Sequence, residues 1–177
     1  MKVSFERTGE RRYATVVTLP GQAPRRMDPA PAYDDEIPHD LVHYLVEAEL
    51  GLASGVYGRA AAGGGEFLAA SDAPGDPRRQ ARERRRLKKR EASLSRTDPG
   101  DMARSEHLAG LCDLAWRRRA GARTPAWAER RPIPAEDAPI VDRVLDRLDE
   151  TAPLWRDLPI GGALTFTWPD TSVTVSR

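Results

Sequence analysis

Apolar and polar residues alternate at both ends of the chain, and this pattern restricts the fold more than any other feature. Near the N-terminus, residues 2–6 alternate, and a β-rich run covers 13–19 after a Thr-Gly-Glu turn. Near the C-terminus, residues 164–168 alternate, and the pattern resumes at 173–175 after a Pro-Asp turn. Alternation with a period of two is typical of half-buried strands, so each end of the chain predicts a β-hairpin.

Three stretches between the hairpins have the apolar spacing of helices. Residues 37–50 are apolar on two opposite sides, 108–115 carry one apolar stripe, and 140–148 form the core face of a helix that ends or kinks near Pro153. Residues 56–62 could add a short helix. The sequence therefore predicts an α+β fold, in which a small antiparallel sheet from the N- and C-terminal hairpins packs against about three to four helices.

The formal net charge of +1 conceals an uneven distribution. Residues 78–96 contain ten Lys or Arg and two Glu, whereas the rest of the chain is acidic overall. Their only bulky apolar side chains are Leu87 and Leu94, so a helix there has little apolar surface to bury. We therefore expect a single α+β domain over 1–177 with a flexible basic insertion at 71–100.

The composition also limits the class of protein. The chain has no apolar run long enough to span a membrane, and its first residues lack the apolar segment of a signal peptide. Its single cysteine, Cys112, cannot form an internal disulfide, and it excludes multi-cysteine zinc modules. These features predict a cytoplasmic protein. Arginine outnumbers lysine 25 to 3, which is typical of a GC-rich bacterial genome.

The stretch 37–47, IPHDLVHYLVE, holds two of the three histidines in the chain. His39 and His43 are one helical turn apart, so both rings can reach one metal ion. Asp40 and Glu47 lie on the same polar strip of a helix that is otherwise apolar, and buried polar groups need partners. This stretch predicts a divalent-metal site, with zinc as the expected ion.

The order His39-Asp40-Leu-Val-His43 resembles the H-E-x-x-H helix of the zincin metallopeptidases over five residues. The resemblance implies that His39 and His43 are zinc ligands and that Asp40 is the general base of a metal-dependent hydrolase. Aspartate is one methylene shorter than the glutamate of that motif, which changes the geometry of a general base. Glu47 is the alternative base.

A zinc site of this kind needs a third ligand from elsewhere in the chain. Glu47 lies about 12 Å along the helix axis from His39, a distance that fits a supporting or capping group better than a ligand. His107 is the expected third ligand, because it lies at the edge of the apolar stripe of the later helix. Glu106, Cys112 and Asp113 on that helix are the alternatives.

The basic segment supports a second hypothesis. Its arginines could bind phosphates or an acidic protein surface, although it contains no aromatic residue for base stacking. The expected nucleic-acid-binding residues are Arg78, Arg79, Arg82, Arg84, Arg85, Arg86, Lys88, Lys89 and Arg90. A third hypothesis is a metal-free scaffold, in which the two histidines make ordinary hydrogen bonds in a small core.

Overall fold

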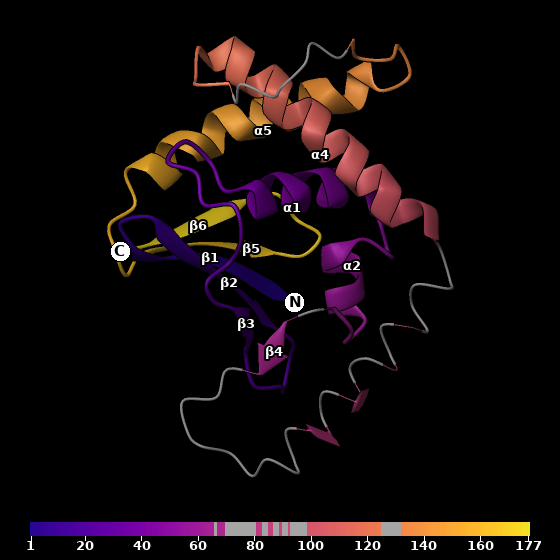
Figure 1. Cartoon of the computed structure of the whole chain (residues 1–177), viewed down its shortest axis with the longest axis vertical. Helices are drawn as coiled ribbons and strands as arrows, with labels where there is room; N and C mark the ends of the chain where they lie inside the picture. The colour runs from indigo at the N-terminus through magenta and orange to yellow at the C-terminus, as the bar shows by residue number, and fades with distance from the viewer. Residues whose placement is uncertain are drawn as a thin grey trace.

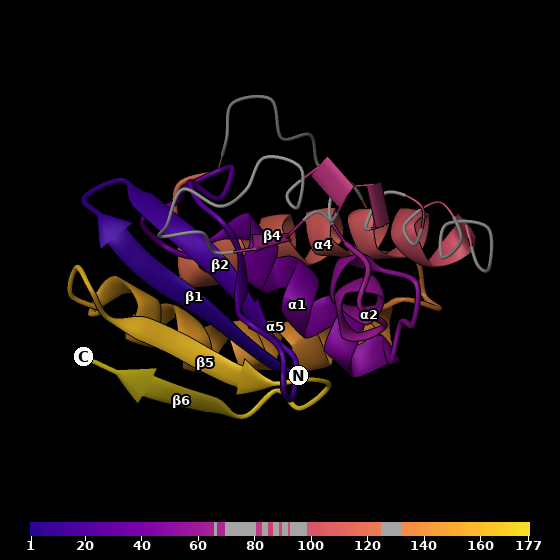
Figure 2. The same ribbon diagram turned by 90° about the horizontal axis from the view of Figure 1, so that it is seen from below.

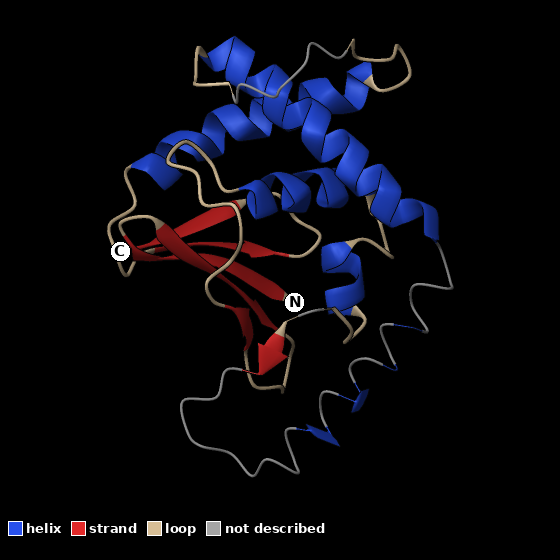
Figure 3. Cartoon of the chain, viewed as in Figure 1, coloured by secondary structure: helices blue, strands red, loops and turns tan. Residues whose placement is uncertain are grey.

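The computed structural model describes residues 1–65, 67–69, 99–124 and 132–177, together with the isolated residues 81, 82, 85, 86, 89 and 92. Strands and helices are segregated, as Figure 3 shows, and this confirms the predicted α+β class. The strands form one antiparallel sheet in the order β4-β3-β2-β1-β5-β6. Figure 2 shows the sheet from its open side, with the helices packed behind it.

Both predicted hairpins are present. The N-terminal one pairs β1 (Lys2–Gly9) with β2 (Arg12–Thr18), and the C-terminal one pairs β5 (Ala163–Thr167) with β6 (Val173–Ser176). The two hairpins join through β1 and β5, where Val3 lies opposite Phe166. The two ends of the chain therefore build the centre of the sheet together.

Two short strands extend the sheet beyond the hairpins. Strand β3 (Arg25–Met27) pairs with β2, and β4 (Leu68–Ala69) pairs with β3. The connection between β2 and the first helix is rich in proline. Pairing with β2 turns part of that connection into a strand.

Helix α1 (His39–Leu50) lies between the sheet and helices α4 and α5, as Figure 1 shows. Its residues 41–47 are all buried. Burial on both sides explains why this helix is apolar on two faces. Gly51 ends it in the left-handed conformation, with a φ of 63°, which glycine adopts without strain.

Three further helices complete the described fold. They are α2 (Val56–Ala61), α4 (Pro99–Ala120) and α5 (Ala138–Arg156). The sequence predicted that this helix ends or kinks near Pro153, and α5 includes Pro153 and ends at Arg156, within one turn of it. Trp155 anchors the last turn of α5 to the core, because its side chain is fully buried and its indole N–H donates to the Asp34 carbonyl at 3.1 Å.

Most of the expected insertion at 71–100 lies outside the described residues, and residues 99 and 100 already belong to α4. No helix in the described part of the chain is long and apolar enough to cross a membrane.

Substitution of two helical glycines by alanine is expected to have opposite effects on the free energy of unfolding. Glycine to alanine inside a helix normally stabilises a protein by about 0.5–1 kcal/mol. At Gly58 in α2, however, an added Cβ would lie 2.2 Å from the Leu52 carbonyl oxygen, whereas at Gly110 in α4 it would meet nothing within 4 Å. We expect Gly58→Ala to lower the free energy of unfolding by about 2–3 kcal/mol and Gly110→Ala to raise it by about 0.5–1 kcal/mol. Urea denaturation measures both, and a change of the same sign in both variants would contradict this packing.

Candidate metal centre

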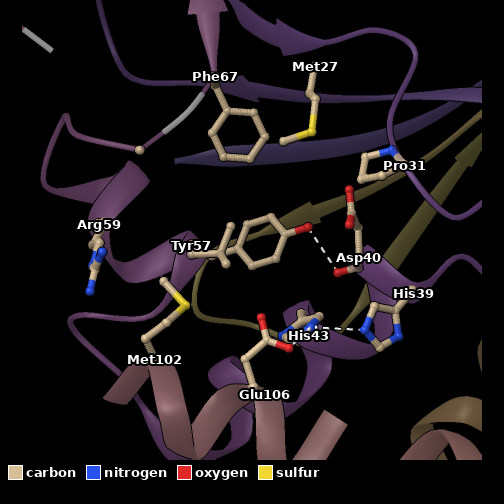
Figure 4. Close-up of a pocket in the computed structure, with 12 residues that line it drawn as sticks. Met27, Pro31, His39, Asp40, His43, Tyr57, Arg59, Phe67, Met102 and Glu106 are labelled. Carbon is tan, nitrogen blue, oxygen red and sulfur yellow. Dashed lines mark hydrogen bonds and ion pairs between the residues drawn. The ribbon is translucent and has the colours of Figure 1, made fainter. Parts of the chain in front are cut away.

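Helices α1 and α4 bring three ligating side chains together. His39 and His43 project from consecutive turns of α1, and Glu106 projects toward them from α4 (Figure 4). The Nε2 atoms of the two histidines are 3.2 Å apart, and Glu106 Oε2 lies 3.6 Å from His43 Nε2. Within the described ranges, this is the one group of His, Cys, Asp or Glu side chains close enough to hold a metal ion, with its ligand atoms within 4.8 Å of one another.

The distance between the two histidine nitrogens fits one tetrahedral ion. Two nitrogens that each bind zinc at about 2.0–2.1 Å lie about 3.3 Å from each other, close to the observed 3.2 Å between the histidine Nε2 atoms. The two rings are nearly perpendicular, at 85°, so their nitrogens converge without stacking. Two histidines and one glutamate leave a coordination position open, as in catalytic zinc sites.

Hydrogen bonds from Ser105 and Glu47 determine which ring nitrogen of His43 carries a hydrogen and which has a lone pair available for a metal. Ser105 Oγ donates to Glu47 Oε1 at 2.8 Å and lies 2.9 Å from His43 Nδ1. Because the serine hydrogen is directed at Glu47, the serine oxygen accepts from Nδ1–H of His43. This tautomer leaves the Nε2 lone pair facing His39 and Glu106. Burial, and then the proximity of His39, lower the pKa of His43 to about 4, so the ring is neutral at neutral pH.

Glu47 supports this arrangement from a fully buried position. Its carboxylate accepts the backbone N–H groups of Val56 and Tyr57, both at 2.8 Å, in addition to the Ser105 hydroxyl. Burial raises the pKa of Glu47, and these hydrogen bonds oppose the rise. Glu47 does not line the cavity beside the cluster, so it holds α2 and Ser105 in place rather than facing a substrate.

Asp40 lies next to the cluster but outside it. Its carboxylate accepts the Thr15 hydroxyl at 3.0 Å, and in Figure 4 it points toward Pro31 rather than toward the histidine Nε2 atoms. Burial raises the pKa of Asp40, while hydrogen bonds from Thr15 and Tyr13 lower it. Unlike Glu47, Asp40 lines the cavity.

The expected third ligand, His107, directly follows Glu106 on α4, but its side chain points away from the two histidines. Its Nε2 is 3.5 Å from a carboxylate oxygen of Asp137, and the side chain is about half exposed. Of the alternatives, Cys112 is buried, which raises its thiol pKa to about 12, and Asp113 pairs with Arg117 at 2.9 Å. The structure therefore brings Glu106, and not His107, to the two histidines.

A cavity of about 390 Å³ opens beside the cluster. The charged and ionisable side chains in its lining are His39, His43, Glu106, Asp40 and Arg59 (Figure 4). Apolar side chains from β3, α2, α4 and the intervening loops form much of the rest, namely Met27, Pro31, Val56, Tyr57, Phe67 and Met102. The candidate metal centre is thus open to a small molecule.

The basic segment is only partly described. Arg82, Arg85, Arg86 and Lys89 are helical and exposed. The other expected nucleic-acid contacts, Arg78, Arg79, Arg84, Lys88 and Arg90, lie outside the described residues. Binding of nucleic acid or of an acidic protein surface through this segment stays a prediction.

Sequence reasoning missed Ser105. A serine on a helix gives no sign of whether it faces water or a buried carboxylate, so no pattern in the sequence could have identified it. Comparison with protein-family models, curated proteins and solved structures finds no match to this chain, so a function has to be inferred from the geometry of the site.

Proposed function

We propose that the protein binds one zinc ion through His39 Nε2, His43 Nε2 and the Glu106 carboxylate, and that it is a metal-dependent hydrolase. The observation that carries this proposal is the convergence of the two histidine Nε2 atoms at 3.2 Å with Glu106 beside them. The hydrogen bond to Ser105 supports it, because ligating histidines commonly donate their other N–H to a neighbouring acceptor.

With zinc as the bound ion, the ligand set supports hydrolysis, because two histidines and one glutamate also hold the metal of zinc hydrolases. A zinc ion with three protein ligands lowers the pKa of a bound water toward neutrality and polarises a carbonyl oxygen. In the proposed reaction, the water oxygen forms a bond to an acyl carbon, and the bond from that carbon to the leaving oxygen or nitrogen breaks. The proton passes from the water to the leaving group through Asp40, the remaining carboxylate on the cavity wall, whose side chain has to turn from Thr15 toward the open coordination position to reach it.

Removing the metal tests the first part of the proposal. Protein purified without chelator is expected to contain about one zinc per chain by elemental analysis. Chelation by EDTA should lower the melting temperature, and addition of zinc chloride should restore it, because the ion binds the folded state in preference to the unfolded one. A protein that holds no zinc and melts identically with EDTA or with zinc chloride would contradict the proposal.

The role of Asp40 is tested by hydrolysis of a reporter ester, p-nitrophenyl butyrate, with the zinc-loaded protein. Asp40→Asn keeps an acceptor for the Thr15 hydroxyl but removes the base, so we expect turnover to fall by about 100-fold or more with unchanged zinc content. Asp35→Asn is the matched control, because Asp35 is an exposed carboxylate outside the cavity. Equal turnover in the Asp40→Asn variant and the native protein would remove Asp40 from the mechanism.

A further inference from the structure

The cavity beside the metal centre has two chemically different sides. Figure 4 shows His39, His43 and Glu106 at one edge, and the side chains of Phe67 and Met27 on the opposite side of Tyr57. Tyr57 and Phe67 are each only 1% exposed and belong to the core beneath the cavity. The three candidate metal ligands are therefore at one edge of the cavity, whereas Arg59 lies on another part of its wall, where its Nε–H donates to the Ser54 carbonyl at 2.6 Å.

The apolar walls come from separate parts of the chain. Met27 is the last residue of β3, Val56 is the first residue of α2, and Met102 lies on α4 one turn before Glu106. All three are half-buried and line the cavity, so part of each side chain remains available for contact. Burial of these surfaces by a ligand would be favourable in proportion to the apolar area removed from water.

From this arrangement we propose that the site takes a small carboxylic-acid derivative whose carbonyl faces the metal and whose apolar group lies between Met27, Val56 and Met102. This inference rests on the proposed function, since the metal binds the polar end of the ligand. The cavity volume of about 390 Å³ lies within the range of about 300–1,000 Å³ typical of small-molecule sites.

The two methionines are the residues that set specificity. Methionine side chains are flexible and polarisable, so they adapt to aliphatic and aromatic groups alike. A ligand that has only the polar end would leave these walls in contact with water. The site should therefore select for the apolar group of the ligand and tolerate variation in its shape.

Two hydroxamates that differ in their apolar group test this inference on the zinc-loaded protein. Both probes carry the same metal-binding head, and calorimetry measures their affinities. We expect benzohydroxamic acid to bind at least about tenfold more tightly than acetohydroxamic acid, because the phenyl ring would contact the apolar walls. Affinities equal within twofold, with zinc bound, would overturn this inference and leave the proposed metal site standing.

The double variant Met27→Gln/Met102→Gln locates the effect. Glutamine is similar in length to methionine but polar, so the preference for the phenyl probe should fall to within about threefold at unchanged zinc content. Ile160→Gln is the matched control, because Ile160 is 59% exposed and does not line the cavity. If the double variant keeps the full preference for the phenyl probe, the ligand does not lie against these two methionines and the inference is wrong. Absence of zinc in the native protein is a separate result, and it would overturn the proposed function itself.

Discussion

Replacement of Glu47 by alanine is expected to lower the free energy of unfolding by about 3–5 kcal/mol. The carboxylate is fully buried and accepts the N–H groups of Val56 and Tyr57 and the hydroxyl of Ser105. Alanine would leave these donors without their acceptor, and buried donors that lose a partner carry the full cost of desolvation. Urea denaturation of the metal-free protein measures the effect without a contribution from zinc.

Glu49→Ala is the matched control on the same helix. Glu49 forms ion pairs with Arg143 at 3.2 Å and with Arg147 at 4.0 Å, and both arginines are largely exposed. Surface pairs of this kind contribute about 0–1 kcal/mol, so Glu49→Ala should change the stability by no more than that. Similar losses in the two variants would show that Glu47 has no special role in holding α2 and Ser105.

Removal of a metal ligand is expected to have the largest effect on zinc binding. Structural zinc sites with four protein ligands bind with roughly 10–16 kcal/mol, or about 2.5–4 kcal/mol per ligand, so His43→Ala and Glu106→Ala should each weaken zinc binding by about 100-fold or more. Ser105→Ala should weaken it by about 10–100-fold, because it removes the acceptor that orients His43. Competition with a fluorescent zinc chelator measures these affinities.

His107→Ala is the control for this series. His107 is adjacent to Glu106 in sequence, but its ring lies against Asp137 and outside the cluster. We expect its removal to change the zinc affinity by less than threefold. A large loss in His107→Ala together with little change in Glu106→Ala would favour the ligand expected from the sequence and would contradict the proposed site.

The hairpins and the central helix could be predicted because local patterns determine them. The alternation at 2–6 and 164–168 gives each strand one apolar face, and the register in which β1 pairs with β5 keeps these faces on the same side of the sheet. The apolar residues on two sides of 37–50 require burial on both sides, which α1 has. Strand β4 has only two residues and depends on its pairing with β3, so no local pattern could indicate it.

The candidate site was predictable only in part, for a similar reason. A spacing of four residues on one helix brings His39 and His43 together whatever the rest of the fold does. The third ligand depends on how α4 is rotated against α1. Neighbouring residues on a helix point about 100° apart, so the orientation of α4 about its own axis decides whether Glu106 or His107 faces the histidines of α1. Glu47 acquires its partners only when the chain folds back from Gly51 to place α2 beside it.

The position of the bound ion tests the central claim most directly. Crystals of the zinc-loaded protein, measured on both sides of the zinc absorption edge, would locate the metal by its anomalous scattering. We predict one site at about 2.0–2.1 Å from His39 Nε2, His43 Nε2 and a carboxylate oxygen of Glu106. No anomalous peak between these three side chains, or a peak at His107 and Asp137 instead, would contradict the proposed metal centre.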